Sequence, residues 1–179
     1  SKIEKDREMG CVRGPFGYAF FETRIVRRSN MLMEQLLQDG YGYEFNFQDY
    51  AEYPDEETAR EAGKSQTSVK QEEERPKAQG KYYATGEGPQ AEDREGHWTR
   101  YKFIGKTEGG KRIKMTASMG EGYVETAHWA LEVAMVLLFD KAKLPKGIQG
   151  GILTPSVAGQ MCLVERLIDT GIKFDIEYM

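Results

Sequence analysis

Residues 98–119 have the sequence WTRYKFIGKTEGGKRIKMTASM, in which two alternating segments flank a short glycine-rich turn. In 98–106 and in 112–119 apolar and polar side chains alternate, which is the period of a β-strand with one buried face. Residues 107–110 (TEGG) supply the glycines that a tight reversal of the chain uses. This stretch therefore predicts an antiparallel hairpin.

The segments that follow the hairpin predict two helices and a strand. Residues 123–143 are apolar almost all round in the middle of a helical pattern, which predicts a central core helix lying across the inner face of the sheet. A second helix is predicted to begin with Thr154 as N-cap and Pro155 at the first position, and to end at Gly171. Residues 172–178 (IKFDIEY) alternate again and predict a final strand with one solvated face.

The N-terminal part of the chain predicts two helices and one strand. Apolar positions recur loosely at helical spacing over 20–37, and we expect this helix to end with Gly40 as a left-handed cap. From 41 to 53 polar and aromatic residues alternate, which predicts a strand. Pro54 and the carboxylates after it predict a short helix that fades at Gly63.

Residues 64–96 differ in composition from the segments on both sides. They hold few aliphatic side chains and many charges, glycines and prolines, so their own contacts cannot repay the entropy of ordering. We expect a long, exposed polar excursion within a single domain that spans residues 1–179. The order of elements predicts an α+β fold, with an antiparallel or mixed sheet of about four or more strands and helices packed on one face.

The charge and cysteine content argue against several classes of protein. With 25 basic and 29 acidic residues and a net charge of −4, the chain has no basic field that would collect nucleic acid. Cys11 and Cys162 stand far apart without a metal-ligand spacing, which predicts no metal site and favours a reducing, intracellular compartment. The longest apolar run, 127–139, is interrupted by Glu132 and is shorter than the ~20 residues that cross a bilayer, so no membrane span is predicted.

Three blocks of sequence carry a resemblance to a known family. The first is ETRIVRRSN at 22–30, the second is GYVETAHWALEVAMVLLFDKAKLP at 122–145, and the third is GGILTPSVAGQMCLVERLIDTGIKFDI at 150–176. Together they resemble the C-terminal region of the saccharopine dehydrogenase-like oxidoreductases, a family that includes the trans-acting enoyl reductases. The blocks follow the family's order, and the resemblance covers most of the chain outside 54–96.

The resemblance implies a two-domain enzyme of which this chain is the second domain. In that family an N-terminal Rossmann domain binds NAD(P), and the domain represented here covers the active site and often mediates dimer contacts. The sequence has no strand followed by GxGxxG and a helix, and the GEG at 86–88 lacks that spacing. The chain alone is therefore not expected to bind NAD(P) or to catalyse hydride transfer, and whether it is an enzyme by itself stays open.

The expected partners follow from the same resemblance. They are a Rossmann domain or partner subunit that supplies the NAD(P) half, a second copy of the chain in a homodimer, and a small apolar or carboxylate-bearing substrate. The function implied is that of a substrate-pocket and dimerisation domain. Two other functions remain open: a stand-alone small-molecule-binding or cyclase/isomerase-like domain that has lost redox chemistry, and a structural subunit that docks through residues 64–96.

The first candidate ligand-binding residues lie in the block at 22–30. Arg24, Arg27 and Arg28 share one face of the predicted helix, and Asn30 follows them. Guanidinium groups capture carboxylates and phosphates in a bidentate manner, and Arg27 is the best single candidate for a ligand contact. The alternative is a solvated or salt-bridged face that pairs with the acidic segment at 42–57.

The second candidate group lies at the start of the helix predicted after the hairpin. Glu125, His128 and Glu132 share a face, which suits proton transfer or metal ligation, or else an ordinary polar stripe on a buried helix. Gly122 and Tyr123 belong to a strand-to-helix loop whose backbone N–H groups could receive an anion, the alternative being a tight turn with ordinary capping. The sequence assigns no catalytic residue.

Overall fold

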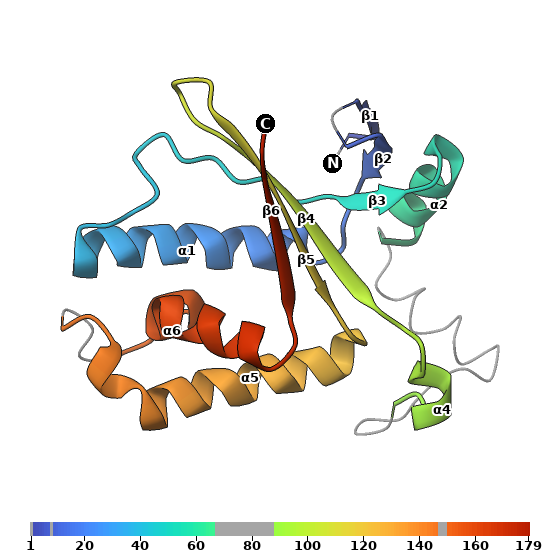
Figure 1. The fold of residues 1–179 in the computed structure, drawn as a ribbon. Helices are drawn as coiled ribbons and strands as arrows, with labels where there is room; N and C mark the ends of the chain where they lie inside the picture. The colour runs from blue at the N-terminus through green and yellow to red at the C-terminus, as the bar shows by residue number, and fades with distance from the viewer. Residues whose placement is uncertain (1, 8, 67–87, 147–149) are drawn as a thin grey trace. The chain divides into compact units, whose positions relative to one another are not determined.

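The computed structural model describes residues 2–7, 9–66, 88–146 and 150–179, and it divides the chain into two compact units, Ser1–Gly88 and Pro89–Met179 (Figure 1). The predicted α+β class is confirmed. In the described ranges there are five α-helices and six strands, and the strands form two three-stranded antiparallel sheets. Most of the predicted polar excursion, residues 67–87, lies outside the described residues.

The first unit contains a small sheet that the sequence patterns did not predict. Its strands are hydrogen-bonded in the order β1 (Glu4–Asp6), β2 (Cys11–Gly14) and β3 (Ala51–Tyr53). Arg13 lies opposite Glu4 in the register and donates from Nη2 to Glu4 Oε2 at 2.8 Å. The Arg13 guanidinium also donates to Asp6 Oδ2 at 3.3 Å, so one side chain holds both ends of the β1–β2 pair.

Helix α2 (Glu56–Gln66) packs against this sheet and confirms the helix predicted after Pro54. It begins where Asp55 Oδ1 accepts a hydrogen bond from the Thr58 backbone N–H at 2.8 Å, which lowers the pKa of the Asp55 carboxyl. Gly14 allows the close approach, because a Cβ there would lie 3.0 Å from Tyr53 Cε2 and 3.2 Å from the Cβ of the fully buried Ala59.

Helix α1 (Ala19–Leu37) matches the predicted helix at 20–37, but its C-terminal cap is not the predicted one. Gln38 takes the left-handed conformation, with φ 54°, and its N–H donates to the Glu34 carbonyl at 3.1 Å. The prediction that Gly40 adopts this conformation is wrong, because the helix closes two residues earlier. The Gly40 N–H instead donates to Glu34 Oε2 at 3.2 Å.

The strand predicted over 41–53 is confined to β3, and most of residues 41–50 form no regular structure. The start of this segment is tied to α1, since Asn30 Oδ1 accepts a hydrogen bond from the Tyr41 N–H at 2.6 Å. Only three residues of the alternating segment pair with a neighbouring strand, β2. Alternation alone therefore overestimated the strand, because a strand also needs a partner along its whole length.

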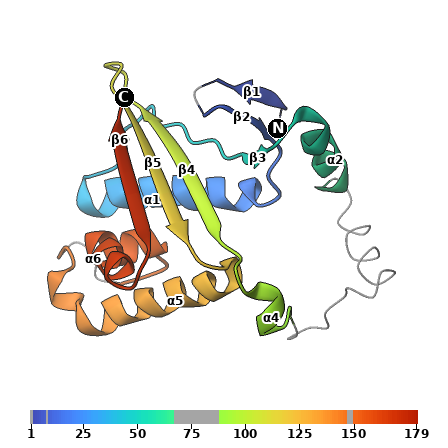
Figure 2. The ribbon, with the colours of Figure 1, turned by 45° about the vertical axis from the view of Figure 1, so that its right-hand side comes forward.

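The second unit is built on the hairpin predicted from residues 98–119. Strands β4 (Thr99–Lys106) and β5 (Arg112–Met119) pair antiparallel over eight residues, from Thr99 opposite Met119 to Lys106 opposite Arg112. The final strand, β6 (Lys173–Tyr178), pairs with β5 and completes the sheet (Figure 2). Both predictions are confirmed. The short helix α4 (Ala91–Arg94) precedes β4.

Two long helices of the second unit were also predicted. Helix α5 (Gly122–Phe139) is followed by one 3₁₀ turn, η1 (Lys141–Lys143). Helix α6 (Pro155–Asp169) has Thr154 as N-cap residue and Pro155 at its first position, as expected, although no side-chain hydrogen bond from Thr154 caps it. It closes through Gly171, whose φ of 111° only glycine adopts easily.

The core of the second unit lies between α5, α6 and one end of the sheet. Buried Val136, Leu163, Leu167 and Ile172 form its centre. Partly buried apolar side chains from all three elements surround that centre, namely Met119, Trp129, Val133, Leu144, Cys162 and Phe174. Both ribbon views show α5 and α6 side by side (Figures 1 and 2).

The prediction that α5 is a buried core helix across the sheet is wrong. Only Glu132 and Val136 of α5 are buried, because the helix packs mainly against α6 and not across the face of the sheet. Its opposite face is exposed. Among the described residues, no helix has the length and apolar character needed to cross a membrane.

Candidate functional site

The candidate residues fall into two groups on different units. Arg24, Arg27, Arg28 and Asn30 lie on α1 in the first unit, whereas Gly122, Tyr123 and His128 lie on α5 in the second.

The three arginines of α1 are exposed, and within the described ranges no ion pair involves them. The predicted pairing with the acidic segment at 42–57 is thus not among the ion pairs of the described residues. Arg24 stays close to its own helix, since Nη1 donates to the Phe20 carbonyl at 2.7 Å and the guanidinium lies 3.4 Å from the centre of the Phe20 ring. Arg27 and Arg28 present their charge to solvent on the same face.

Asn30 has a structural task. Its Oδ1 accepts from the Tyr41 N–H, and its Nδ2 donates to the Gly42 carbonyl at 3.5 Å. The side-chain amide thus holds the segment that follows α1. Its oxygen and nitrogen are both used in these hydrogen bonds, and they are the atoms with which it would bind a ligand.

The first unit also contains a carboxylate pair that the sequence did not reveal. Burial, together with the nearby carboxyl group of Asp49, raises the pKa of Glu22 to about 7. Asp49 Oδ2 is buried and has no hydrogen-bond partner in the part of the chain that the structure describes. Glu22 lies on α1 and Asp49 on the irregular segment before β3, so no motif spacing links the two side chains.

His128 joins the start of α5 to the end of α6. Its Nδ1 lies 2.9 Å from Glu125 Oε2, and its Nε2 lies 2.7 Å from Thr170 Oγ1. Glu125 is held in turn by the Gly120 N–H, which donates to Oε1 at 3.0 Å. Sequence spacing predicted the shared face of Glu125 and His128, but Thr170 lies on another helix and no pattern pointed to it.

The imidazole therefore stands between a carboxylate and a hydroxyl group, as a proton-relay residue would. Thr170 Oγ1 also donates to the Arg166 carbonyl at 2.8 Å. The hydroxyl has one proton, so the Arg166 carbonyl and an unprotonated His128 Nε2 compete for it. The direction of the two hydrogen bonds of His128 depends on which ring nitrogen carries the proton. This arrangement fixes helix ends, and it is consistent with the polar-stripe alternative for this face.

Glu132, the third member of the predicted face, takes part in a buried ion-pair network instead. Arg166 Nε donates to Glu132 Oε2 at 2.6 Å, and Arg166 Nη1 donates to Asp140 Oδ2 at 3.2 Å. Lys143 Nζ donates to Asp140 Oδ1 at 2.6 Å, and this bond is the main cause of the lowered pKa of the Asp140 carboxyl. Two carboxylates, Glu132 and Asp140, are thus balanced by two cations, Arg166 and Lys143.

The loop at the start of α5 is capped by its own acidic residue. Glu121 Oε2 accepts from the Val124 N–H at 3.0 Å, and hydrogen bonds from the Tyr123 and Val124 N–H groups lower the pKa of Glu121. These are the backbone donors that an anion at Gly122 and Tyr123 would use. Ordinary capping, the alternative stated for this loop, therefore describes its geometry.

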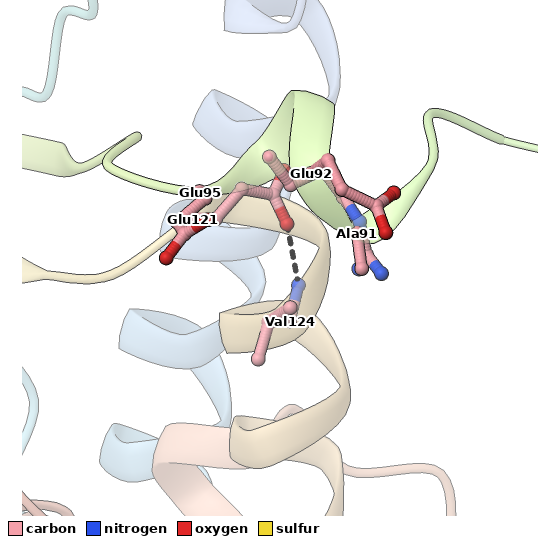
Figure 3. A pocket seen from close by; sticks show the side chains of 6 residues that line it. Ala91, Glu92, Glu95, Glu121 and Val124 are labelled. Carbon is pink, nitrogen blue, oxygen red and sulfur yellow. Dashed lines mark hydrogen bonds between the residues drawn. The ribbon is translucent and has the colours of Figure 1, made fainter.

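A shallow hollow of about 370 Å³ lies beside this loop (Figure 3). Val124 of α5 forms part of its wall, and the carboxylates of Glu92, Glu95 and Glu121 approach it from two segments. Ala91 and Arg94 complete the lining. The hollow is open and lined by three carboxylates and one guanidinium, so it does not resemble the deep, enclosed pocket that a lipophilic ligand requires.

The candidate residues do not explain the exposed apolar face of α5. Val124, Leu131 and Leu138 are 51%, 57% and 70% exposed, and the exposed alanines Ala127 and Ala134 lie between them. The spacing alternates between three and four residues, which is the a/d repeat of a helix that packs along a partner helix. We call these five residues the α5 seam.

Comparisons with protein-family models, with curated proteins and with solved structures found no match to this chain. Within the described residues, no group of three or more His, Cys, Asp or Glu side chains is arranged to hold a metal ion.

Proposed function

We propose that this chain is the substrate-pocket and dimerisation domain of a saccharopine dehydrogenase-like oxidoreductase. NAD(P) binds to a Rossmann half that this chain does not contain, and hydride transfer takes place only when both halves are present. The three sequence blocks at 22–30, 122–145 and 150–176 support the family, because they occur in the family's order.

The α5 seam is the observation that carries the dimerisation part of the proposal. An exposed row of valine and leucine side chains costs free energy in water, and a contiguous apolar surface of this kind marks an interaction site. The opposite face of the same helix is fixed to α6 by His128 and by the Arg166 network. These contacts hold α5 against α6 with the α5 seam facing solvent.

The exposed arginines of α1 support the pocket part of the proposal. Arg27 and Arg28 carry unpaired positive charge in the described ranges, which suits a substrate that bears a carboxylate on an apolar body.

The coding sequence upstream of Ser1 tests this function. The proposal predicts an in-frame stretch that encodes a strand, a GxGxxG turn and a helix, or a separate neighbouring gene that encodes them. If neither exists, and if no Rossmann protein co-purifies with this chain from its source, the oxidoreductase assignment fails.

A further inference from the structure

The α5 seam is complementary to itself when two copies run in opposite directions. In antiparallel helix pairs the a positions of one helix lie opposite the d positions of the other. Pairing Ala127 with Leu138 of a second copy also pairs Leu131 with Ala134. Each leucine then faces an alanine, so that large and small side chains alternate across the contact and the two backbones approach closely.

We propose that two copies of this chain form a homodimer through an antiparallel contact between their α5 helices. The proposal rests on the dimerisation function proposed above and names its surface, its partner and its register. Four seam layers are used: Ala127 with Leu138, Leu131 with Ala134, and their two-fold equivalents. The contact extends over most of an 18-residue helix, which is about 27 Å long.

The charges at the two ends of α5 are complementary in the same register. Beyond Val124 lies the hollow, whose three carboxylates, Glu92, Glu95 and Glu121, outnumber its one cation, Arg94. Beyond Leu138 lies Lys141, which is exposed and forms none of the ion pairs of the described residues. Lys141 follows the C-terminal end of α5, which in this register comes beside the Val124 end of the other copy, so each lysine lies near a hollow of net negative charge. The opposed helix dipoles favour the same direction.

A lipid surface fits the seam less well than a second copy does. Helices that lie on membranes carry basic residues beside their apolar face. The α5 seam is bounded at one end by three carboxylates, which an anionic surface repels, and the other side of the helix is packed against α6. The alternation of large and small side chains also gives no packing advantage in contact with fluid acyl chains. It does favour close packing against a second helix.

The mass of the chain in solution, measured by light scattering during size-exclusion chromatography, gives the first test. We expect a dimer at about 50 µM, because the seam places apolar side chains in contact along most of α5. Leu131→Lys places two charges in the central layers and is expected to give a monomer. Ile168→Lys is the matched control, since Ile168 is 51% exposed on α6, and this variant should stay dimeric.

Cysteine cross-linking tests the register. In a Cys11→Ser, Cys162→Ala background, the double variant Ala127→Cys, Leu138→Cys should form a disulfide-linked dimer on mild oxidation, while Leu131→Cys alone should not. In a parallel pair the single variant would cross-link instead. A parallel cross-link, a monomeric parent chain, or a Leu131→Lys protein that stays dimeric would each overturn the proposal.

Two further outcomes separate this inference from its alternatives. A monomeric chain that floats with phosphatidylcholine and phosphatidylserine vesicles, and loses this binding in Leu131→Lys, would overturn the dimer and assign the seam to lipid. A dimer with the predicted cross-link but no Rossmann sequence at the locus would support the dimer contact while removing the oxidoreductase function. The two proposals therefore fail independently.

Discussion

His128 Nε2 lies 2.7 Å from Thr170 Oγ1, and this contact ties the first turns of α5 to the residue that ends α6. Both helices contribute to one core, so this contact helps to hold α5 in place against α6, with the α5 seam on its opposite face.

Removing the Thr170 hydroxyl should weaken the contact between α5 and α6 and lower the free energy of unfolding. Thr170→Val keeps the shape of the side chain but leaves His128 Nε2 and the Arg166 carbonyl without this partner, so the free energy of unfolding should fall by about 1 kcal/mol. Urea denaturation followed by circular dichroism measures the change. Thr170→Ser keeps the hydroxyl and is the control, and equal losses in the two variants would show that the hydrogen bond contributes nothing.

The ion pair between Arg166 and Glu132 should show strong coupling. Arg166→Met leaves the carboxylate of Glu132, a residue only 6% exposed, without its main partner, so the melting temperature should fall by several degrees. The double variant with Glu132→Met replaces both charges by apolar groups and should recover most of that loss. A double variant less stable than either single one would contradict this account of the network.

Truncation of the core should destabilise the second unit more than removal of the Thr170 hydroxyl does. Leu167 is 2% exposed at the centre of the cluster, and Leu167→Ala should cost about 2–5 kcal/mol through lost burial and the cavity left behind. Thermal unfolding checks this value. Leu138→Ala, on the exposed seam, is the matched control and should leave the stability of a monomeric Leu131→Lys background nearly unchanged.

The stability of the first unit should fall as the pH rises from about 4.5 to about 7. The pKa of Glu22 is raised to about 7 from an ordinary 4.5, so the folded unit binds this proton more tightly than the unfolded chain does. The stability that the protonated carboxyl contributes is fully present below about 4.5 and is lost as the pH rises toward about 7. Glu22→Gln should remove this slope.

Melting temperatures of the parent and Glu22→Gln proteins at pH 5 and pH 8 provide the measurement. The variant should be the more stable of the two at pH 8, because it carries no charge beside Asp49. A pH dependence that is the same in both proteins would show that Glu22 is not the group responsible.

Arg27 should contribute to ligand binding and not to folding. Arg27→Ala is expected to weaken binding of cis-parinaric acid, a fluorescent carboxylate on an apolar chain, several-fold with no change in melting temperature, because Arg27 is exposed. Arg7→Ala removes an exposed charge elsewhere in the unit and is the control. Equal affinities for the parent and Arg27→Ala proteins would remove Arg27 from the proposed pocket.

The sequence predicted the elements whose period extends over many residues. Helices α1, α5 and α6 and strands β4, β5 and β6 lie close to their expected positions. Strands β1 and β2 have three and four residues, too few for a period of two to be distinguished from irregular chain. Over 41–53 the alternation was real, but most of that segment has no partner strand.

The candidate site was predicted in part, and for a physical reason. Helical spacing shows which residues share a face, and Glu125 and His128 are in contact as grouped, whereas Glu132 pairs with Arg166. It does not show which element covers that face, and Thr170 and Arg166 came from α6. For the same reason the apolar pattern of α5 was interpreted as burial within one chain, whereas a helix that is apolar on two sides can also face a second molecule.

Titration with NADPH, followed by nicotinamide fluorescence, tests the central claim most directly. The account predicts no binding to this chain alone, and micromolar or tighter binding to a protein that joins it to the Rossmann half encoded at its locus. Tight binding of NADPH to the isolated chain, or no binding to the joined protein, would contradict it.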